Sequence, residues 1–238
     1  MRIMKIVVEL LSYLKAPSPN LKQTSIDKQF LIIIFIISYS IKTIWLLTVN
    51  QWIRNSFHVE RSEIASPDAD TIEFFFLIVV VYPVAEEFIF RYFLKGKKWV
   101  TVFIISLVLS FLLVKLTKYI PFPELTTKRI ALAFSFCLPL LLGTFFYVKA
   151  NKSGTLDSLF SRFFHFLFYF SIISFALLHS FNFKISGHPI WLLPMLVPFL
   201  VSGAALGFVR MKWGLIASII LHMSFNLVTF ILDKGLSI

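Results

Sequence analysis

Only one of the 238 residues is a cysteine, and Cys137 lies within an apolar run. A disulfide framework and a cluster of thiolate metal ligands are therefore excluded. Ten-residue segments of alternating apolar and polar residues are also lacking, which disfavours a membrane β-barrel. The sequence contains no internal repeat, no low-complexity tract and no stretch typical of a second soluble domain.

Three common catalytic arrangements are missing as well. The chain has neither a His-Glu-x-x-His metal motif nor a Gly-x-Ser-x-Gly nucleophile elbow. The aspartates lie only at the ends of apolar runs or between them, so a pair of intramembrane aspartates is excluded. These residues are Asp27, Asp68, Asp70, Asp157 and Asp233.

Apolar residues, in contrast, are abundant. They make up 58% of the chain, phenylalanine alone supplies 29 residues, and the mean hydropathy is +0.85. A soluble core of this size cannot bury so much apolar surface. Because a bilayer requires about 20 apolar residues per helix, the sequence predicts an all-α, polytopic membrane helix bundle with about seven transmembrane helices. The predicted spans are 29–49, 71–94, 99–118, 129–148, 163–182, 190–211 and 214–232.

The first 28 residues follow a different pattern. Polar residues recur every three or four positions between Arg2 and Lys15, with Leu, Ile and Val opposite them. This spacing is typical of an amphipathic helix that lies on a membrane surface in contact with lipid. We therefore divide the chain into an interfacial segment, 1–28, and a single integral membrane domain, 29–238.

The chain carries a net charge of +11. Because the lysines and arginines cluster between the apolar runs, we interpret them as contacts to lipid headgroups and as signals of orientation, and we expect no nucleic-acid partner. Segments on the N-terminal side hold more of these residues than segments on the opposite side, which predicts that the N-terminus lies inside.

Charged side chains interrupt the second apolar run. A charge at the bilayer centre costs about 2.5–3.5 kcal/mol even on the most permissive scale, and this run contains Glu86, Glu87 and Arg91. Glu87 and Arg91 are four residues apart and can pair on one helix face. Glu86 points about 100° away from Glu87 and has no local partner.

Two later runs also carry polar residues at helical spacing. Phe175 and His179 share one face of the fifth run, and His222 and Asn226 share one face of the last run. Each pair alone is compatible with helix packing. Together with Glu86, these residues indicate a hydrolytic site: Glu86 and His179 would activate a water, and His222 and Asn226 would stabilise an oxyanion. Glu87 and Arg91 would hold Glu86 in place.

A metal site is the alternative arrangement of the same residues. Glu86, His179 and His222 provide one carboxylate and two imidazoles, a set that suits Zn²⁺. We favour a site without a metal cofactor, because only one of the two glutamates is free of an arginine partner. The sequence leaves both arrangements open.

The segments EEFIFR, FALLH and HMSFN occur in this order on three hydrophobic runs. They resemble the EExxxR, FxxxH and HxxxN motifs of the CPBP family, which comprises type II CAAX prenyl proteases and the related bacteriocin-processing (Abi) proteins. The resemblance implies a family core from about 70 to 232 and an intramembrane endopeptidase acting on a membrane-associated or lipidated peptide. It also implies a bacterial plasma membrane, and it assigns the six site residues the roles given above.

The chain departs from this resemblance in one respect. Glu86 and His179 are 93 residues apart, and two extra helices over about 99–148 separate their spans. Counted from the predicted span ends, Glu86 would lie nearer the inner face and His179 nearer the outer face. Two other functions therefore stay open: a non-catalytic immunity or scaffold protein of the same family, and a proton-coupled transporter that uses Glu86 and His179 as a relay.

Overall fold

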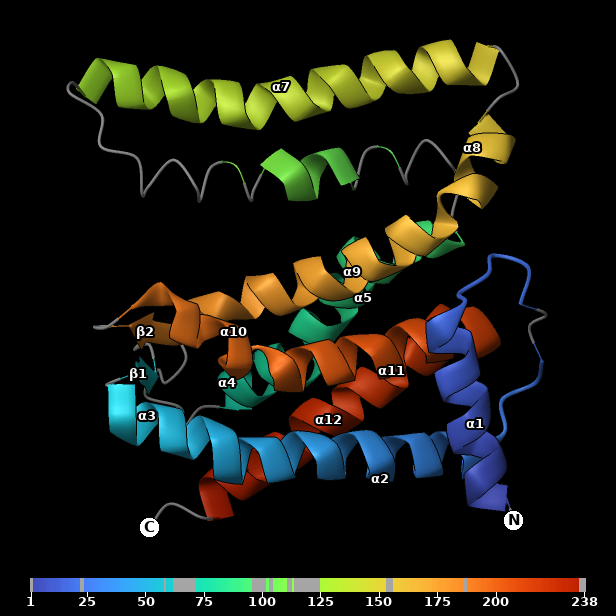
Figure 1. Ribbon diagram of the computed structural model, residues 1–238, viewed down its shortest axis with the longest axis vertical. Helices are drawn as coiled ribbons and strands as arrows, with labels where there is room; N and C mark the ends of the chain where they lie inside the picture. The colour runs from blue at the N-terminus through green and yellow to red at the C-terminus, as the bar shows by residue number, and fades with distance from the viewer. Residues whose placement is uncertain are drawn as a thin grey trace. The chain divides into compact units, whose positions relative to one another are not determined.

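The computed structural model describes residues 2–21, 24–57, 59–61, 72–95, 102, 105–110, 113, 125–152, 156–185 and 188–235. Helices dominate this part of the chain (Figure 1). The elements are α1 (Arg2–Lys15), α2 (Lys28–Trp45), η1 (Leu46–Asn50), α3 (Gln51–Phe57), β1 (Val59–Arg61), α4 (Ile72–Phe76), η3 (Leu77–Val81), α5 (Tyr82–Arg91), η4 (Tyr92–Leu94), α7 (Leu125–Lys152), α8 (Leu156–Arg162), α9 (Phe164–Leu178), η6 (His179–Asn182), β2 (Phe183–Ile185), η7 (Pro189–Trp191), α10 (Leu192–Met195), α11 (Val197–Trp213) and α12 (Leu215–Gly235).

Several of these helices are long and apolar enough to cross a membrane. Three qualify alone, namely Lys28–Phe57, Phe164–Asn182 and Leu215–Leu232. The pair Pro189–Met195 and Val197–Trp213, bent by 42°, adds a fourth if it forms one span. The protein is thus an all-α integral membrane protein, but the predicted number of seven spans is not confirmed. The predicted span 99–118 lies mostly outside the described residues.

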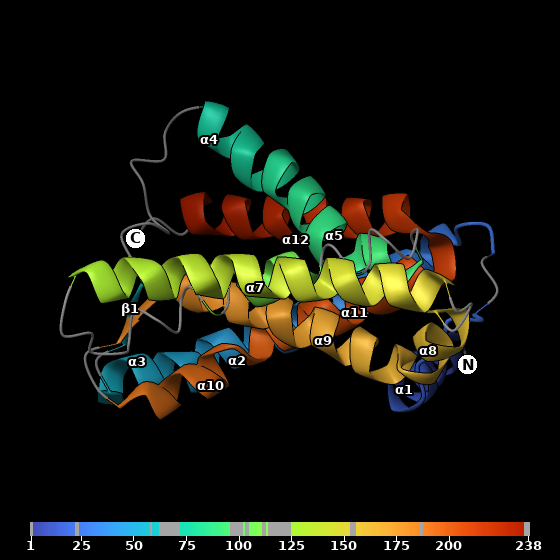
Figure 2. The ribbon, with the colours of Figure 1, turned by 90° about the horizontal axis from the view of Figure 1, so that it is seen from above.

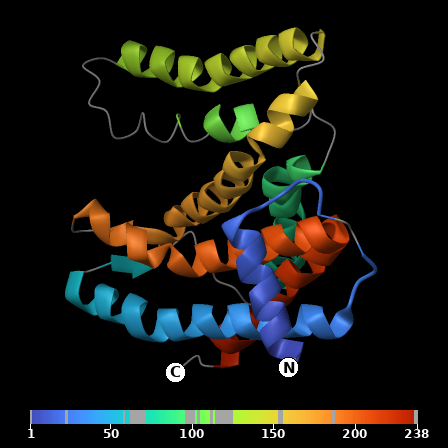
Figure 3. The same ribbon diagram turned by 45° about the vertical axis from the view of Figure 1, so that its right-hand side comes forward.

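The chain forms two compact units, Met1–Arg91 with His165–Ile238, and Tyr92–Phe164. In the first unit α2 packs against α11 and α12, and α1 crosses the ends of α2 and α11 (Figures 1 and 3). Asp27 caps α2 by accepting the Phe30 N–H at 3.1 Å. Aromatic stacking joins α2 to its neighbours: Phe30 stacks on Phe208 of α11, and Phe35 stacks on Phe225 of α12.

The rod formed by α4, η3 and α5 crosses α12 obliquely, and its η3 and α5 parts pack against α12 (Figure 2). Its middle, η3, is a π-helical turn in which the Tyr82 N–H reaches back five residues to the Leu77 carbonyl. The next residue, Pro83, has no N–H to continue this pattern, so the Ile78 carbonyl requires another donor. A π-helical turn holds about one residue more than an α-helical turn. The rod therefore contains one extra residue a short distance before Glu86 and Glu87.

Small residues allow α9 and α11 to approach closely. A Cβ atom added at Gly203 would lie 3.2 Å from Ile172, and one added at Gly207 would lie 3.0 Å from the Phe168 ring. The GxxxG spacing therefore serves helix packing. Gly214, with φ of 95°, ends α11 and allows the chain to turn into α12.

The second unit is described mainly by α7, a single long helix with Pro139 in its interior (Figure 1). Its exposed side chains include Phe134, Leu141 and Phe145, which suits contact with lipid. The predicted extra helices over 99–148 fall within the range of this unit.

Candidate functional site

The buried centre of the first unit is the Glu87 carboxylate. Arg91 Nη1 donates to its Oε1 at 2.9 Å, as the four-residue spacing predicts, and His222 Nδ1 lies 3.0 Å from the same oxygen. Ser218 donates to the second oxygen, Oε2. Glu87 and Arg91 are both fully buried, and each of the two carboxylate oxygens has a donor. Glu87 therefore acts as a fixed negative charge that orients α12 against α5.

Glu86 lies on the other side of the same helix turn, where its carboxylate meets two imidazoles. Its Oε2 is 3.6 Å from His222 Nε2 and 4.0 Å from His179 Nε2. Among the described residues this oxygen accepts no hydrogen bond. The side chains of Glu86 and His179 are 19% and 16% exposed, whereas Glu87 is closed off. The structure thus brings Glu86, His179 and His222 from three helices to one point, where the Glu86 Oε2 atom is buried while the Glu86 and His179 side chains are partly exposed.

Each of the two histidines has one ring nitrogen fixed by a neighbour. His179 Nδ1 is 2.9 Å from the Phe175 carbonyl, and His222 Nδ1 is 3.0 Å from Glu87. A carbonyl and a carboxylate only accept, so both Nδ1 atoms carry a proton and donate. In a neutral ring, each Nε2 atom then has a free lone pair on the side of Glu86. This lone pair can accept a proton.

Phe175 is the aromatic residue around which these groups are arranged. The Arg91 guanidinium lies 4.0 Å from its ring centre, the His179 ring packs against it in a tilted arrangement at 4.6 Å, and His222 meets it edge-on at 5.6 Å. A cation held over an aromatic face is stabilised by the ring quadrupole. This position explains why a phenylalanine stands one turn before His179: its ring packs against the arginine and against both histidines.

Asn226 lies one turn beyond His222 on α12, and its position is linked to the π-helical turn. Its Nδ2 donates to the Ile78 carbonyl at 2.9 Å, the group that Pro83 leaves without a backbone donor. Asn226 therefore ties α12 to the rod that carries Glu86. Its predicted role at an oxyanion stays a prediction.

The expected difference in depth between Glu86 and His179 was wrong, because the two side chains meet at 4.0 Å. A shift of the span that carries His179 does not explain this result, because the span begins at Phe164, next to the predicted first residue, 163. Counting residues from span ends assumes helices that follow the membrane normal, whereas helices in membranes are tilted and bent.

Two residues that the sequence analysis did not single out also surround the site. Ser218 is one turn before His222 and donates to Glu87. Phe199 stacks on the His179 ring at 4.3 Å. Lys42 lies in the middle of the Lys28–Phe57 span, 5.7 Å from the centre of the Tyr39 ring. Ser218 could have been found by its helical spacing from His222, whereas the contact of Phe199 depends on tertiary packing.

Glu86, His179 and His222 together form a candidate donor set for a metal ion. The chemistry fits, because both histidines present Nε2 while a carbonyl or carboxylate holds Nδ1, as around many zinc ions. The spacing is wider than ideal: donors about 2.0–2.1 Å from a tetrahedral Zn²⁺ lie about 3.3–3.4 Å apart, against 3.6 and 4.0 Å here. Among the described residues no group of three histidine, cysteine or acidic side chains has the geometry of a metal site.

Comparisons with known proteins identify the family. A family model described as Type II CAAX prenyl endopeptidase Rce1-like matches residues 68–228. Comparisons with curated proteins and with solved structures gave no match. The matched stretch covers more than half of the chain and contains Glu86, Glu87, Arg91, His179 and His222, the side chains that meet in the first unit. The chain therefore belongs to the Rce1-like family of type II CAAX prenyl endopeptidases.

Proposed function

We propose that this protein is an intramembrane endopeptidase that hydrolyses a peptide bond in a membrane-associated or lipidated peptide. The meeting of Glu86, His179 and His222 from three helices is the observation that carries the proposal. Membership of the Rce1-like family supports a protease. A prenylated peptide is the first substrate to test, because the family description names CAAX prenyl endopeptidases.

In the proposed mechanism Glu86 and His179 position and deprotonate the attacking water. Two acceptors about 2.8 Å from one water and about 90–105° apart are about 4.0–4.4 Å from each other. The 4.0 Å between Glu86 Oε2 and His179 Nε2 suits such a shared water. The proton taken from this water would later pass to the leaving amine.

His222 would stabilise the oxyanion that forms on the scissile carbonyl. When protonated, its Nε2 becomes a donor on the side of Glu86, and the Glu87 carboxylate at 3.0 Å stabilises the positive ring. Asn226 would provide a second donor from the next turn of the same helix. Arg91 and Ser218 act through Glu87 and are positioning residues.

A metal-assisted reaction is the alternative for the same residues. Glu86, His179 and His222 would hold a Zn²⁺ ion, which lowers the pKa of a bound water to about 7. We propose the metal-free arrangement because the donor spacing is wide. Loss of cleavage with a chelator, restored by added zinc, would support the metal-assisted arrangement instead.

The experiment compares purified wild type with Glu86→Gln in proteoliposomes that contain a quenched fluorescent peptide, with and without a prenyl group. Glu73→Gln, an exposed glutamate on the same rod, is the matched control. We expect Glu86→Gln to lower kcat by about 10²-fold or more, because general acid–base groups contribute about 10²–10⁴-fold. Equal cleavage by Glu86→Gln and Glu73→Gln would show that Glu86 is not the catalytic base. No cleavage by the wild type would favour the non-catalytic or transport alternatives.

We further propose a bacterial plasma membrane as the location, with the N-terminus inside. The excess of lysine and arginine on that side supports this orientation. Labelling of a single cysteine introduced at Ser12 on the cysteine-free Cys137→Ser background, from one side of sealed vesicles, tests it. Labelling of Ser12→Cys from outside would reverse the assignment.

A further inference from the structure

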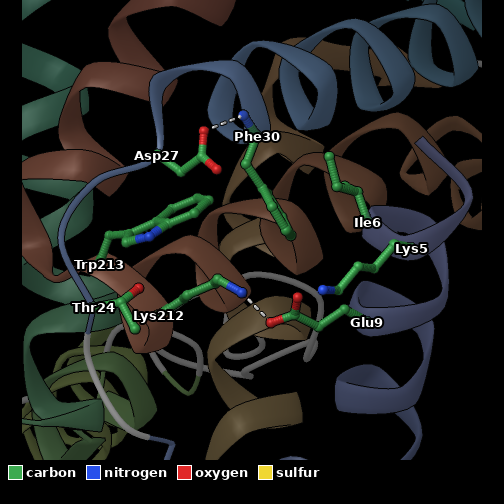
Figure 4. A pocket seen from close by; sticks show the side chains of 8 residues that line it. All are labelled: Lys5, Ile6, Glu9, Thr24, Asp27, Phe30, Lys212 and Trp213. Atoms are coloured by element: carbon green, nitrogen blue, oxygen red, sulfur yellow. Dashed lines mark hydrogen bonds and ion pairs between the residues drawn. The ribbon is translucent and has the colours of Figure 1, made fainter. Parts of the chain in front are cut away.

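A second polar pocket, of about 320 Å³, lies in the first unit. Its walls come from α1, the segment before α2, the first turn of α2 and the end of α11 (Figure 4). Neither the glutamates nor the histidines of the candidate catalytic site line it. Its volume falls at the lower end of the usual range for small-molecule sites, about 300–1,000 Å³.

Part of the charge in this pocket is already paired. Lys212 of α11 makes an ion pair with Glu9 of α1 and also lies 4.4 Å from the centre of the Phe30 ring. Asp27 accepts the Phe30 N–H as the cap of α2. These contacts hold α1 against α2 and α11, and they fix the positions of the two carboxylates and one ammonium.

Two donors in the walls lack such contacts. Trp213 is only 7% exposed, and among the described residues its Nε1 has no hydrogen-bond partner. In Figure 4 this nitrogen lies on the edge of the indole ring that faces Thr24 and Lys212. Lys5, on the opposite wall, makes no ion pair within the described part of the chain. A buried donor without a partner is unfavourable, so the Trp213 N–H favours a ligand that carries an acceptor, and the exposed ammonium of Lys5 favours an anionic one.

The position of the pocket indicates a lipid as the source of this anion. Trp213 ends the bent apolar pair that is long enough to cross the membrane. The neighbouring helix α1 exposes Ile3, Met4, Val8 and Leu11, the pattern of a helix that lies in the interface. Tryptophan and lysine at the end of a span are typical of the depth of lipid headgroups.

The two carboxylates select among headgroups. With two lysines and two acidic residues, the lining carries no net charge. A purely anionic headgroup would add negative charge beside Glu9 and Asp27, whereas a zwitterion with a primary ammonium also brings a cation that can lie next to these carboxylates. A choline headgroup has no N–H to donate to these carboxylates.

We propose that this pocket binds the phosphoethanolamine headgroup of a membrane phospholipid, with Trp213 Nε1 and Lys5 on the phosphate and Asp27 and Glu9 facing the ammonium. The bound lipid would join α1 to the end of α11, because both helices provide walls of the pocket. This proposal is independent of peptidase activity.

The test uses the purified, delipidated full-length protein in detergent, with thermal unfolding measured against ligand concentration. The ligands are short-chain phosphatidylethanolamine, phosphatidylcholine and phosphatidylglycerol, and inorganic phosphate. We expect phosphatidylethanolamine to raise the Tm at the lowest concentration. An equal effect of all three lipids would overturn the proposal, and an equal effect of inorganic phosphate would show an anion site without a lipid and overturn it as well.

Two variants separate the pocket from general lipid effects. Trp213→Phe keeps the aromatic ring and removes only the N–H, and Trp52→Phe, at an exposed position outside the pocket, is its control. Lys5→Gln is compared with Lys28→Gln, an exposed lysine that does not line the pocket. We expect Trp213→Phe and Lys5→Gln each to weaken the apparent Kd for phosphatidylethanolamine about tenfold. If Lys5→Gln, which is exposed and should fold, binds as tightly as Lys28→Gln, the proposal is wrong.

Discussion

Replacing Arg91 by methionine tests how strongly the buried charge network holds the fold. The substitution removes the guanidinium that donates to Glu87 at 2.9 Å and leaves a fully buried carboxylate without its main cation. Breaking one partner of a buried ion pair costs about 3–5 kcal/mol. Because His222 and Ser218 still contact the Glu87 carboxylate, we expect a loss of about 3 kcal/mol, at the low end of this range.

The assay is thermal or denaturant unfolding in detergent, with Arg54→Met as the control at an exposed arginine. The double variant Glu87→Gln/Arg91→Met removes both charges, so it should be less destabilised than the sum of the two single variants. If Arg91→Met unfolds like Arg54→Met, or if the effects of the single variants simply add, the pair does not hold α5 and α12 together in the way inferred here.

Other predictions concern separate contacts. Asn226→Leu should destabilise the protein by about 1–3 kcal/mol, because the Ile78 carbonyl loses its donor; unchanged unfolding would show that this bond is unimportant. Gly207→Val should lower the Tm, because a Cβ there already lies 3.0 Å from Phe168; an unchanged Tm would contradict the close packing. Burial raises the pKa of Tyr13, so the unfolded chain ionises first and stability should fall only above about pH 10. Tyr13→Phe should reduce this fall, as measured by unfolding between pH 8 and 11.

Local spacing within one helix was a reliable basis for prediction. The Glu87–Arg91 pair follows from a four-residue separation and is present at 2.9 Å. The amphipathic pattern of the first residues predicts a helix, and α1 spans Arg2–Lys15. The GxxxG spacing of α11 is typical of closely packed helices, and Gly203 and Gly207 do lie against Ile172 and Phe168 of α9, although the spacing alone does not name the partner helix. In each case the physical cause acts over one or two helical turns.

Contacts between distant segments could not be predicted in the same way. Ser218 and Glu87 are 131 residues apart, and their hydrogen bond depends on how α12 packs against α5. The π-helical turn has no signal in the residues Leu77–Val81, which are all aliphatic, and only Pro83 after it hints at a freed carbonyl. The predicted span 71–94 consists of the consecutive elements α4, η3, α5 and η4, and it is not among the described helices that are long and apolar enough to cross a membrane.

The π-helical turn also sets the rotational phase of the rod. Phe75 contacts Phe230 of α12 at 5.1 Å between ring centres, and Glu87, twelve residues later, contacts His222 of the same helix. In an uninterrupted α-helix, twelve residues at about 100° each would place these side chains about 120° apart. One residue absorbed by the wider turn reduces this angle to about 20°. Both ends of the rod therefore face a single neighbour, and Glu86, one helical step round from Glu87, still reaches His222 of that neighbour as well as His179.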